Sequence, residues 1–299
     1  MNELIAKAEV LLEALPYIKR FAGRTIVIKY GGAAMLSDEL RDGFAEDVVL
    51  LKSLGLNPVV VHGGGPQIGE ALKRSGVETR FVRGMRVTDK AVMDVVEMVL
   101  GGTINMGIVS MIQGHGGQAI GLSGKDGGLL EAVPMKVVVE GSNEAVDLGQ
   151  VGEVTRVNPG VLEKFISTDY IPVIAPIGAG SDGLSYNINA DLAASHIARA
   201  LGAAKLMLLT DVEGIRGSDS QLSPRVSTLQ ARAWIEGGAI EGGMIPKVEC
   251  GLDALAGGVS QVHIIDGRVS HAVLLEIFTN TGVGTELVLG TEDGAPRGG

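Results

Sequence analysis

The chain has 299 residues and an unusual 45 glycines, with 45% hydrophobic and 20% charged residues. The glycines follow no G-X-Y period, which excludes a collagen-like fibre, and the hydrophobic content excludes a disordered chain. The formal net charge is −10, and no block of positive charge indicates a nucleic-acid partner. The single cysteine, Cys250, can form neither an intrachain disulfide nor a zinc site without several other ligands. We therefore expect a cytoplasmic protein of one large or two ordinary domains.

The N-terminal segment predicts an amphipathic helix, because its apolar residues recur at the spacing of one helical face: Leu4, Ala8, Leu11, Leu15 and Ile18. Pro16 lies inside this pattern and is expected to kink or end the helix. Acidic and basic residues are scattered through the segment, which is unlike the continuous apolar region of a signal peptide.

Short apolar runs then alternate with helical patterns along the chain. Strands are expected at residues 25–28, 57–61, 119–122, 171–177 and 206–209. Helices are expected at residues 38–54, 66–76, 90–113 and 190–201, the last with Asn189 as its N-cap. This alternation predicts an α/β fold, a three-layer αβα sandwich around a central, mostly parallel sheet, with an extra N-terminal helix. Residues 129–154 break the rhythm and suggest a hairpin insertion, and the tail 291–299 is expected to be disordered.

Residues 98–124 contain no Asp, Glu, Lys or Arg and are long enough to span a bilayer. The same stretch holds eight glycines as well as Asn105, Gln113, His115 and Gln118. A buried helix that runs into a glycine turn and a strand is therefore favoured over membrane insertion.

Glycine loops follow several of the expected strands, and bare backbone N–H groups at such positions can hold phosphate. They lie at residues 31–32, 63–65, 124–128 and 178–183. Each loop alone is more typical of an ordinary turn, but several at strand ends favour a phosphate site. No P-loop is present, because the Gly124-Lys125 pair is followed by Asp126. Residues 178–183 match the dinucleotide pattern G-x-G-x-x-G, but five residues intervene before the next helix, so we interpret them as a chance match.

Five short motifs place charged or polar residues beside these glycines, in chain order Ile28-Lys29-Tyr30-Gly31-Gly32, Val61-His62-Gly63-Gly64-Gly65-Pro66, Arg83-Gly84-Met85-Arg86-Val87-Thr88, Asn187-Ile188-Asn189-Ala190-Asp191 and Gly242-Gly243-Met244-Ile245-Pro246-Lys247. Together they resemble the amino acid kinase family over about residues 25–289. They are most similar to the members that act on N-acetyl-L-glutamate.

The resemblance implies transfer of the γ-phosphoryl group of ATP to the side-chain carboxylate of N-acetyl-L-glutamate. It implies these catalytic residues: Lys29, Lys247 and Asp191. It implies these substrate-binding residues: Gly64, Gly65, Arg86 and Asn187. It implies these nucleotide-binding residues: Gly31, Gly32, Thr210 and Asp211. Mg²⁺ would be carried by ATP rather than by a protein cluster. A carboxylate is already ionised at neutral pH, so the reaction needs no general base.

The N-terminal helix resembles an extension found in the arginine-inhibited members, where it joins dimers into a hexamer (a trimer of dimers). The resemblance also implies an L-arginine site at these residues: His263, Glu276 and Gly282, with Tyr17 and Lys205 as weaker candidates. We expect an oligomerisation helix at residues 1–22, an N-acetylglutamate-binding and dimerisation lobe at 23–200 and an ATP-binding lobe with the arginine site at 201–299. A PII-type signalling protein is a further candidate partner, whereas neither nucleic acid nor a membrane is expected.

Other interpretations remain open at this stage. The chain could be another kinase of the family, acting on aspartate, glutamate, carbamate or UMP, or a non-catalytic arginine sensor on the same fold. A dehydrogenase is the alternative from another reaction class. Singly, each lysine is more typical of a solvated surface charge, and His263 could be an ordinary core histidine.

Overall fold

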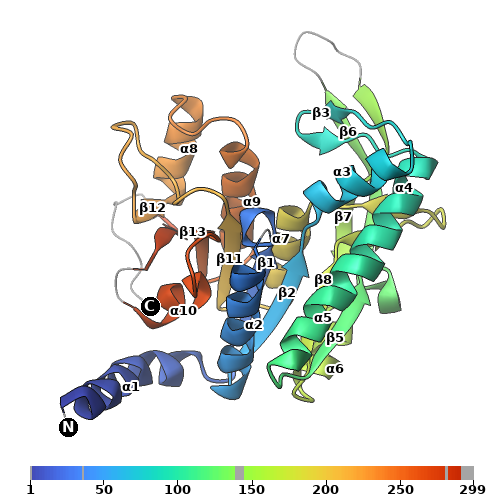
Figure 1. Ribbon diagram of the computed structural model, residues 1–299. Coiled ribbons are helices and arrows are strands. Elements are labelled where there is room, and N and C mark those ends of the chain that lie inside the picture. The colour runs from blue at the N-terminus through green and yellow to red at the C-terminus, as the bar shows by residue number, and fades with distance from the viewer. Residues whose placement is uncertain (1, 36, 139–144, 280–281, 291–299) are drawn as a thin grey trace.

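The computed structural model describes residues 2–35, 37–138, 145–279 and 282–290 (Figure 1). Its central sheet has the strand order β12-β14-β13-β11-β1-β2-β8-β5. The six strands from β13 to β5 run parallel: β1 (Thr25–Tyr30), β2 (Asn57–His62), β5 (Ala119–Ser123), β8 (Ile171–Ala175), β11 (Lys205–Thr210) and β13 (Gln261–Asp266). At the far edge, β14 (Gly284–Val288) is antiparallel to β13, and β12 (Arg225–Ser227) is parallel to β14. The prediction of a mostly parallel sheet is confirmed.

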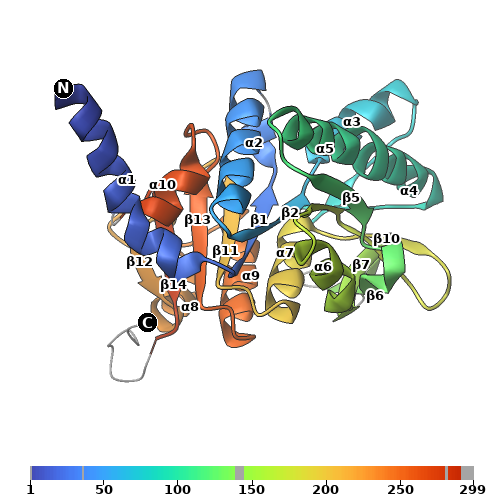
Figure 2. The ribbon, with the colours of Figure 1, turned by 90° about the horizontal axis from the view of Figure 1, so that it is seen from below.

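Helices cover both faces of this sheet (Figures 1 and 2). One face carries α2 (Asp38–Ser53), α3 (Gly65–Arg74), α4 (Lys90–Glu97), α5 (Asn105–Gly114) and α10 (Ala272–Phe278). The other carries α6 (Pro159–Ile166), α7 (Ala190–Ala200), α8 (Thr228–Glu236) and α9 (Met244–Ala256). Alternation along β1 explains the two layers, since Ile26 and Ile28 join the first core and Val27 joins the second. The three-layer αβα prediction is therefore confirmed.

The expected helix at residues 90–113 is present, but its middle is a π-helix, η2 (Met98–Ile104), between α4 and α5. Among the described residues, the continuous segment Lys90–Gly114 is long and apolar enough to cross a membrane by those two criteria. Its buried residues, including Leu100, Ile104 and Ile108, belong to the core that packs on the sheet.

A second, smaller sheet joins β6 (Leu130–Val138), β7 (Ala145–Val157), β9 (Ile177–Ala179) and β10 (Ser185–Asn187). β6 and β7 are antiparallel, as the predicted hairpin insertion requires. The single strand expected at residues 171–177 is wrong: the run breaks at Pro176, and β9 leaves β8 to join this second sheet. Shorter elements complete the fold: β3 (Phe81–Val82), β4 (Met85–Arg86) and the 3₁₀ turns η1 (Gly32–Met35) and η3 (Asp126–Gly128).

The N-terminal helix α1 (Asn2–Phe21) projects away from the rest of the chain (Figures 1 and 2). It does not end at Pro16, which is a correction: the backbone stays helical for five further residues. Pro16 and the outward-facing Leu12 and Leu15 are exposed, whereas Phe21 is buried in the core. The predicted disorder of residues 291–299 lies outside the described residues.

Candidate active site

Two glycine loops meet at the carboxyl ends of β1 and β2. The Gly63 amide donates to the Tyr30 carbonyl at 2.8 Å, and a Cβ on Gly31 would lie 3.4 Å from the Gly63 nitrogen. A Cβ on Gly64 would come within 2.4 Å of Ile104 and 2.7 Å of Leu100, because η2 packs directly against this loop. A side chain at Gly64 would therefore displace Ile104 and Leu100, whereas a Cβ on Gly31 would make an ordinary contact.

His62 and Asn105 hold the glycine loop at residues 63–65 in place through hydrogen bonds. Burial lowers the pKa of the His62 imidazole to about 4, so the ring is neutral at physiological pH. Its Nδ1–H donates to the Gly63 carbonyl at 2.9 Å, and its Nε2 accepts from the Asn105 amide at 3.1 Å. Asn105 also donates to the Val173 carbonyl at 2.9 Å and so ties the loop to β8. Neither role is predictable from the local sequence, because the contact spans 43 residues.

The three candidate catalytic residues converge, although they are far apart in the sequence. Lys29 comes from β1, Asp191 from the first turn of α7 and Lys247 from the first turn of α9. The Lys247 ammonium donates to Asp191 Oδ2 at 2.7 Å, and the Lys29 ammonium lies 3.2 Å from Oδ1. Asn189 is the N-cap of α7, as predicted, and its side chain accepts a hydrogen bond from the Asp191 amide at 2.8 Å. This hydrogen bond fixes the backbone position from which the Asp191 side chain extends. One carboxylate thus holds two ammonium groups.

Burial and charge act in opposite directions on this cluster. Burial lowers the pKa of the Lys29 ammonium, and the attraction of Asp191 only partly offsets it. Burial would raise the pKa of the Asp191 carboxyl, but Lys29 and Lys247 outweigh that effect and hold the pKa below its usual range. Asp191 is therefore ionised at neutral pH. The arrangement concentrates positive charge on a small area, as an anionic reacting group requires.

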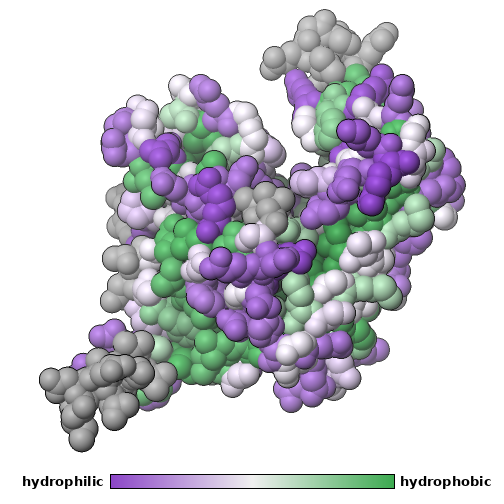
Figure 3. Space-filling view, in the orientation of Figure 1, coloured by the Kyte–Doolittle hydropathy of each residue, from purple (hydrophilic) through white to green (hydrophobic). Residues whose placement is uncertain are grey.

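A cavity of about 250 Å³ opens beside this cluster. Figure 3 shows the molecule hollowed between α8 and the β3–β6 region. The cavity brings together Lys29 and Asp191 with all four predicted substrate residues: Gly64, Gly65, Arg86 and Asn187. It also includes Gly32 of the predicted nucleotide loop. Pro176 and Asn189 line it too, and the sequence analysis did not assign them to the site.

Arg86 and Asn187 line the cavity from two strands, β4 and β10. The Arg86 guanidinium donates to the Gly65 carbonyl and to the Thr79 hydroxyl, both at 3.1 Å, and lies over the Phe81 ring. The Asn187 amide donates to the Thr88 hydroxyl at 3.3 Å. Both side chains are thus held in place by neighbouring groups and can act as directed hydrogen-bond donors.

The other predicted nucleotide residues lie at the end of β11, beside β1. The Lys29 ammonium donates to the Leu209 carbonyl at 3.4 Å, which links the two strand ends. Thr210 is buried, and its hydroxyl donates to the exposed Asp211 carboxylate at 3.2 Å. On the neighbouring strand β1, Gly31 follows the last residue and Gly32 begins the short η1 turn. In the described ranges, no group of three or more His, Cys, Asp or Glu side chains could hold a metal ion.

Two glycine segments highlighted by their sequence lie outside this cavity lining. Residues 178–183 connect β9 to β10 and do not open a helix, as the interpretation of a chance match requires. Residues 124–128 connect β5 to β6. Neither segment lines the cavity.

The predicted arginine-site residues form a buried polar chain beneath α1. The Lys205 ammonium donates to His263 Nε2 at 2.8 Å, and His263 Nδ1 donates to Glu276 Oε1 at 2.6 Å. The other Glu276 oxygen accepts from the Val283 amide at 2.8 Å. Burial lowers the pKa of the Lys205 ammonium to about 8, although Glu286 and Glu276 oppose the effect.

Gly282 and the end of α1 close this cluster. Gly282 has φ +61°, and a Cβ there would lie 2.7 Å from the Glu276 carboxylate. The Phe21 ring lies 5.1 Å from the Lys205 ammonium, and Tyr17 is half-buried against the same core. Sequence reasoning missed Phe21, whose signal was its place at the end of the amphipathic helix.

Comparison with known proteins identifies the family of this site. The model of the amino acid kinase family matches residues 24–266. The chain belongs to the amino acid kinase family. It is 57% identical over 289 residues to acetylglutamate kinase of Syntrophobacter fumaroxidans, covering 95% of this chain and 97% of that protein. It is 58% identical over 282 residues to acetylglutamate kinase of Stutzerimonas stutzeri, covering 93% and 94% respectively.

A solved structure of another enzyme shares this fold. It is N-acetylglutamate synthase of Neisseria gonorrhoeae complexed with coenzyme A and N-acetyl-glutamate, with 26% identity and a TM-score of 0.83. The similarity covers 94% of the chain described here but 63% of the synthase chain. The kinase fold of this chain is thus shared by a protein that is longer.

Proposed function

We propose that this chain is an acetylglutamate kinase, which transfers the γ-phosphoryl group of ATP to the side-chain carboxylate of N-acetyl-L-glutamate. The observation that carries the proposal is the Lys29–Asp191–Lys247 cluster at the edge of a cavity lined by glycine backbone, Arg86 and Asn187. The high identity to curated acetylglutamate kinases over nearly the whole chain supports the choice of acceptor.

The reaction joins two anions, so its main requirements are charge neutralisation and alignment. A carboxylate oxygen of acetylglutamate attacks the γ-phosphorus, and the bond to the β–γ bridging oxygen breaks. The electron pair leaves with ADP, and the product is an acyl phosphate. No proton has to move, because the acceptor is already a carboxylate.

In this proposal the two lysines are the catalytic donors and Asp191 orients them. Each ammonium has three N–H groups, so contact with Asp191 leaves others to donate to the transferring phosphoryl oxygens. These donors are fixed before the substrates arrive, so little reorganisation is needed as charge develops. Asp191 also offsets the burial that favours a neutral Lys29.

We assign acceptor binding to Arg86, Asn187 and the Gly64-Gly65 backbone. The planar Arg86 guanidinium suits bidentate pairing with the α-carboxylate of acetylglutamate. Asn187 of β10 is a second hydrogen-bond partner, and the loop amides complete the cradle. A side chain at Gly64 would have to displace Ile104 and Leu100 of η2.

We assign the ATP phosphates to Gly31 and Gly32, with Thr210 and Asp211 on the nucleotide side. Mg²⁺ would enter with ATP and would neutralise phosphate charge there, without a cluster of protein ligands. In this scheme residues 23–200 form the acetylglutamate-binding and dimerisation lobe, and residues 201–299 form the ATP-binding lobe. The buried Cys250 thiol is free, which suits a reducing compartment such as the cytoplasm.

We further propose feedback inhibition by L-arginine in a hexamer built as a trimer of dimers. The buried Glu276 carboxylate suits an arginine guanidinium, which would compete with the His263 contact. The projecting α1, with exposed Leu12 and Leu15, is the segment that would join dimers. A PII-type signalling protein is a candidate partner of the hexamer.

Hydroxylamine trapping of the acyl phosphate tests the proposed reaction. Purified protein with ATP and Mg²⁺ should give hydroxamate with acetylglutamate and far less with glutamate or aspartate, and added arginine should reduce the yield. Equal or greater yield with glutamate or aspartate would refute the acceptor assignment. Absence of product with all three would refute the kinase activity.

A further inference from the structure

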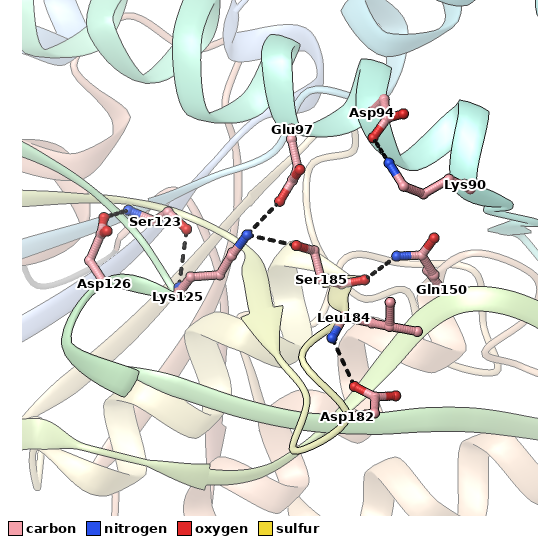
Figure 4. A network of polar contacts seen from close by, with 10 residues as sticks. All are labelled: Lys90, Asp94, Glu97, Ser123, Lys125, Asp126, Gln150, Asp182, Leu184 and Ser185. Carbon is pink, nitrogen blue, oxygen red and sulfur yellow. Dashed lines mark hydrogen bonds and ion pairs between the residues drawn. The ribbon is translucent and has the colours of Figure 1, made fainter.

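The glycine loop at residues 124–128 has no part in the proposed reaction, yet its lysine connects two walls of the cavity. The Lys125 ammonium donates to Ser185 Oγ at 2.7 Å and to Glu97 Oε1 at 2.9 Å. Figure 4 shows this amine between the α4 carboxylate and the β10 hydroxyl. Neither Lys125, Glu97 nor Ser185 lines the cavity itself.

Ser185 leads directly to a substrate-binding candidate. β10 has three residues and ends at Asn187, which lines the cavity. Gln150 of β7 also donates to the Ser185 carbonyl, at 2.8 Å. Ser185 is thus held through its side chain by Lys125 and through its backbone by Gln150. These two anchors add to the pairing of β10 with β9 and with β7.

Glu97 leads to the other wall. It is the last residue of α4, and Leu100 lies three residues further along the same continuous helical segment, in η2. Leu100 lines the cavity and would meet a Cβ on Gly64 at 2.7 Å. The ion pair with Lys125 therefore ties the helix that supports the Gly64 loop to the strand that carries Asn187.

Hydrogen bonds within residues 123–126 fix the backbone of Lys125. The Lys125 amide donates to Ser123 Oγ at 3.0 Å, and the Ser123 amide donates to Asp126 Oδ2 at 2.7 Å. These contacts set the direction in which the long side chain leaves β5. Partial burial raises the pKa of Glu97, but hydrogen bonds from Ser185 and Lys125 outweigh it and lower that pKa, so the carboxylate stays charged at neutral pH.

We propose that Lys125 is a positioning residue for the acceptor site: its ammonium sets the separation between the Gly64 loop and Asn187 without touching the substrate. This inference rests on the proposed function and names a determinant of acetylglutamate binding within it. The predicted nucleotide residues lie at the ends of β1 and β11, and Gly32 lines the same cavity. The side-chain partners of Lys125 are instead on α4 and β10, so ATP binding should not depend on Lys125.

Steady-state kinetics of Lys125→Met and Glu97→Gln test the proposal. Each variant should raise KM for acetylglutamate roughly three- to tenfold, with kcat and KM for ATP within about twofold. The double variant should raise KM by less than the product of the single effects, because both remove the same link. Lys125→Arg, which keeps the charge and can reach two acceptors, should restore KM.

Lys90→Met is the matched control. Lys90 pairs with Asp94 on the same helix, away from β10 (Figure 4), and its side chain is 74% exposed. It should leave every constant unchanged. Equal KM shifts in Lys90→Met and Lys125→Met, or a fall in kcat without a KM change, would overturn the positioning role.

Hydrogen exchange of the unliganded protein gives a readout independent of activity. The β10 amides should exchange faster in Lys125→Met and Glu97→Gln, and at the wild-type rate in Lys90→Met. Unchanged β10 exchange in Lys125→Met would overturn the proposal. A wild type that makes no acyl phosphate from acetylglutamate would instead refute the proposed function, and the exchange data would still decide whether Lys125 orders β10.

Discussion

Asp191→Asn separates the charge of Asp191 from its shape. The amide fills nearly the same space, but it no longer neutralises Lys29 and Lys247, which lie 3.2 and 2.7 Å from the carboxylate oxygens. Their side chains are 10% and 19% exposed, so water cannot replace the lost counter-charge. The two ammonium groups are then left facing each other and an amide.

We expect kcat to fall roughly 10²–10³-fold, the usual cost of disturbing one preorganised transition-state donor, or about 3–4 kcal/mol of activation free energy. The unfolding free energy should fall by about 3–5 kcal/mol near neutral pH, because breaking a buried ion pair leaves uncompensated charge. Hydroxamate formation measures the first quantity and urea denaturation the second.

The pH dependence follows from the pKa shifts. Burial already lowers the pKa of Lys29, and removal of Asp191 deletes the main opposing attraction, so that pKa falls further in the variant. The ammonium then loses its proton at lower pH, and the alkaline fall of kcat should shift to lower pH. The stability difference should be largest near neutrality. It should shrink in acid, where wild-type Asp191 becomes protonated, and in alkali, where Lys29 of the variant becomes neutral.

Asp94→Asn, at an exposed position on α4, is the control and should change neither quantity. An Asp191→Asn protein that is folded by circular dichroism and keeps kcat within about threefold would refute the orienting role. An alkaline limb that stays in place would refute the charge argument even if kcat fell.

Three further predictions follow from the same geometry. Arg86→Ala should raise KM for acetylglutamate roughly tenfold or more with little change in kcat. Arg86→Lys should not restore the wild-type KM, because lysine lacks the planar fork of the guanidinium. A loss of kcat alone in steady-state assays would contradict this binding role. Glu276→Gln keeps an acceptor for the Val283 amide but loses the charge, so the arginine concentration for half-inhibition should rise at least about tenfold while uninhibited kcat stays the same. Deletion of residues 1–20 should leave an active dimer with a weakened arginine response; light scattering that finds the full-length chain already dimeric would contradict the role of α1.

The sheet and its helices were predictable because the apolar periodicity is local. The β1 pattern follows from neighbouring residues, and so does the capping of α7 by Asn189. The two wrong element boundaries both lie at prolines, where tertiary context and local sequence favour different backbone structures. Pro16 lies within a helix that continues to Phe21, and Pro176 ends β8 so that the next residues pair in another sheet.

The candidate site depended on long-range arrangement, which spacing alone does not encode. Lys29, Asp191 and Lys247 are separated by 162 and 56 positions, and their grouping followed from family resemblance rather than from periodicity. Lys125 shows the limit of that approach. Its glycine loop suggested phosphate binding, but the partners that define its place, Glu97 and Ser185, are 28 and 60 residues away.

Asp191 links the chemistry of the site to the stability of the fold. It sits on α7, in the proposed acetylglutamate lobe, and its stronger contact is with Lys247 on α9, in the proposed ATP lobe. In the proposed mechanism the carboxylate is therefore both the orienting group of the catalytic donors and the shared partner of an ion pair between the proposed lobes. Because the same charge serves both roles, a substitution that removes the buried carboxylate also removes the group that orients the two lysines. Burial of these three charged side chains costs desolvation free energy, and the same three side chains would neutralise the transferring phosphoryl group in the proposed reaction.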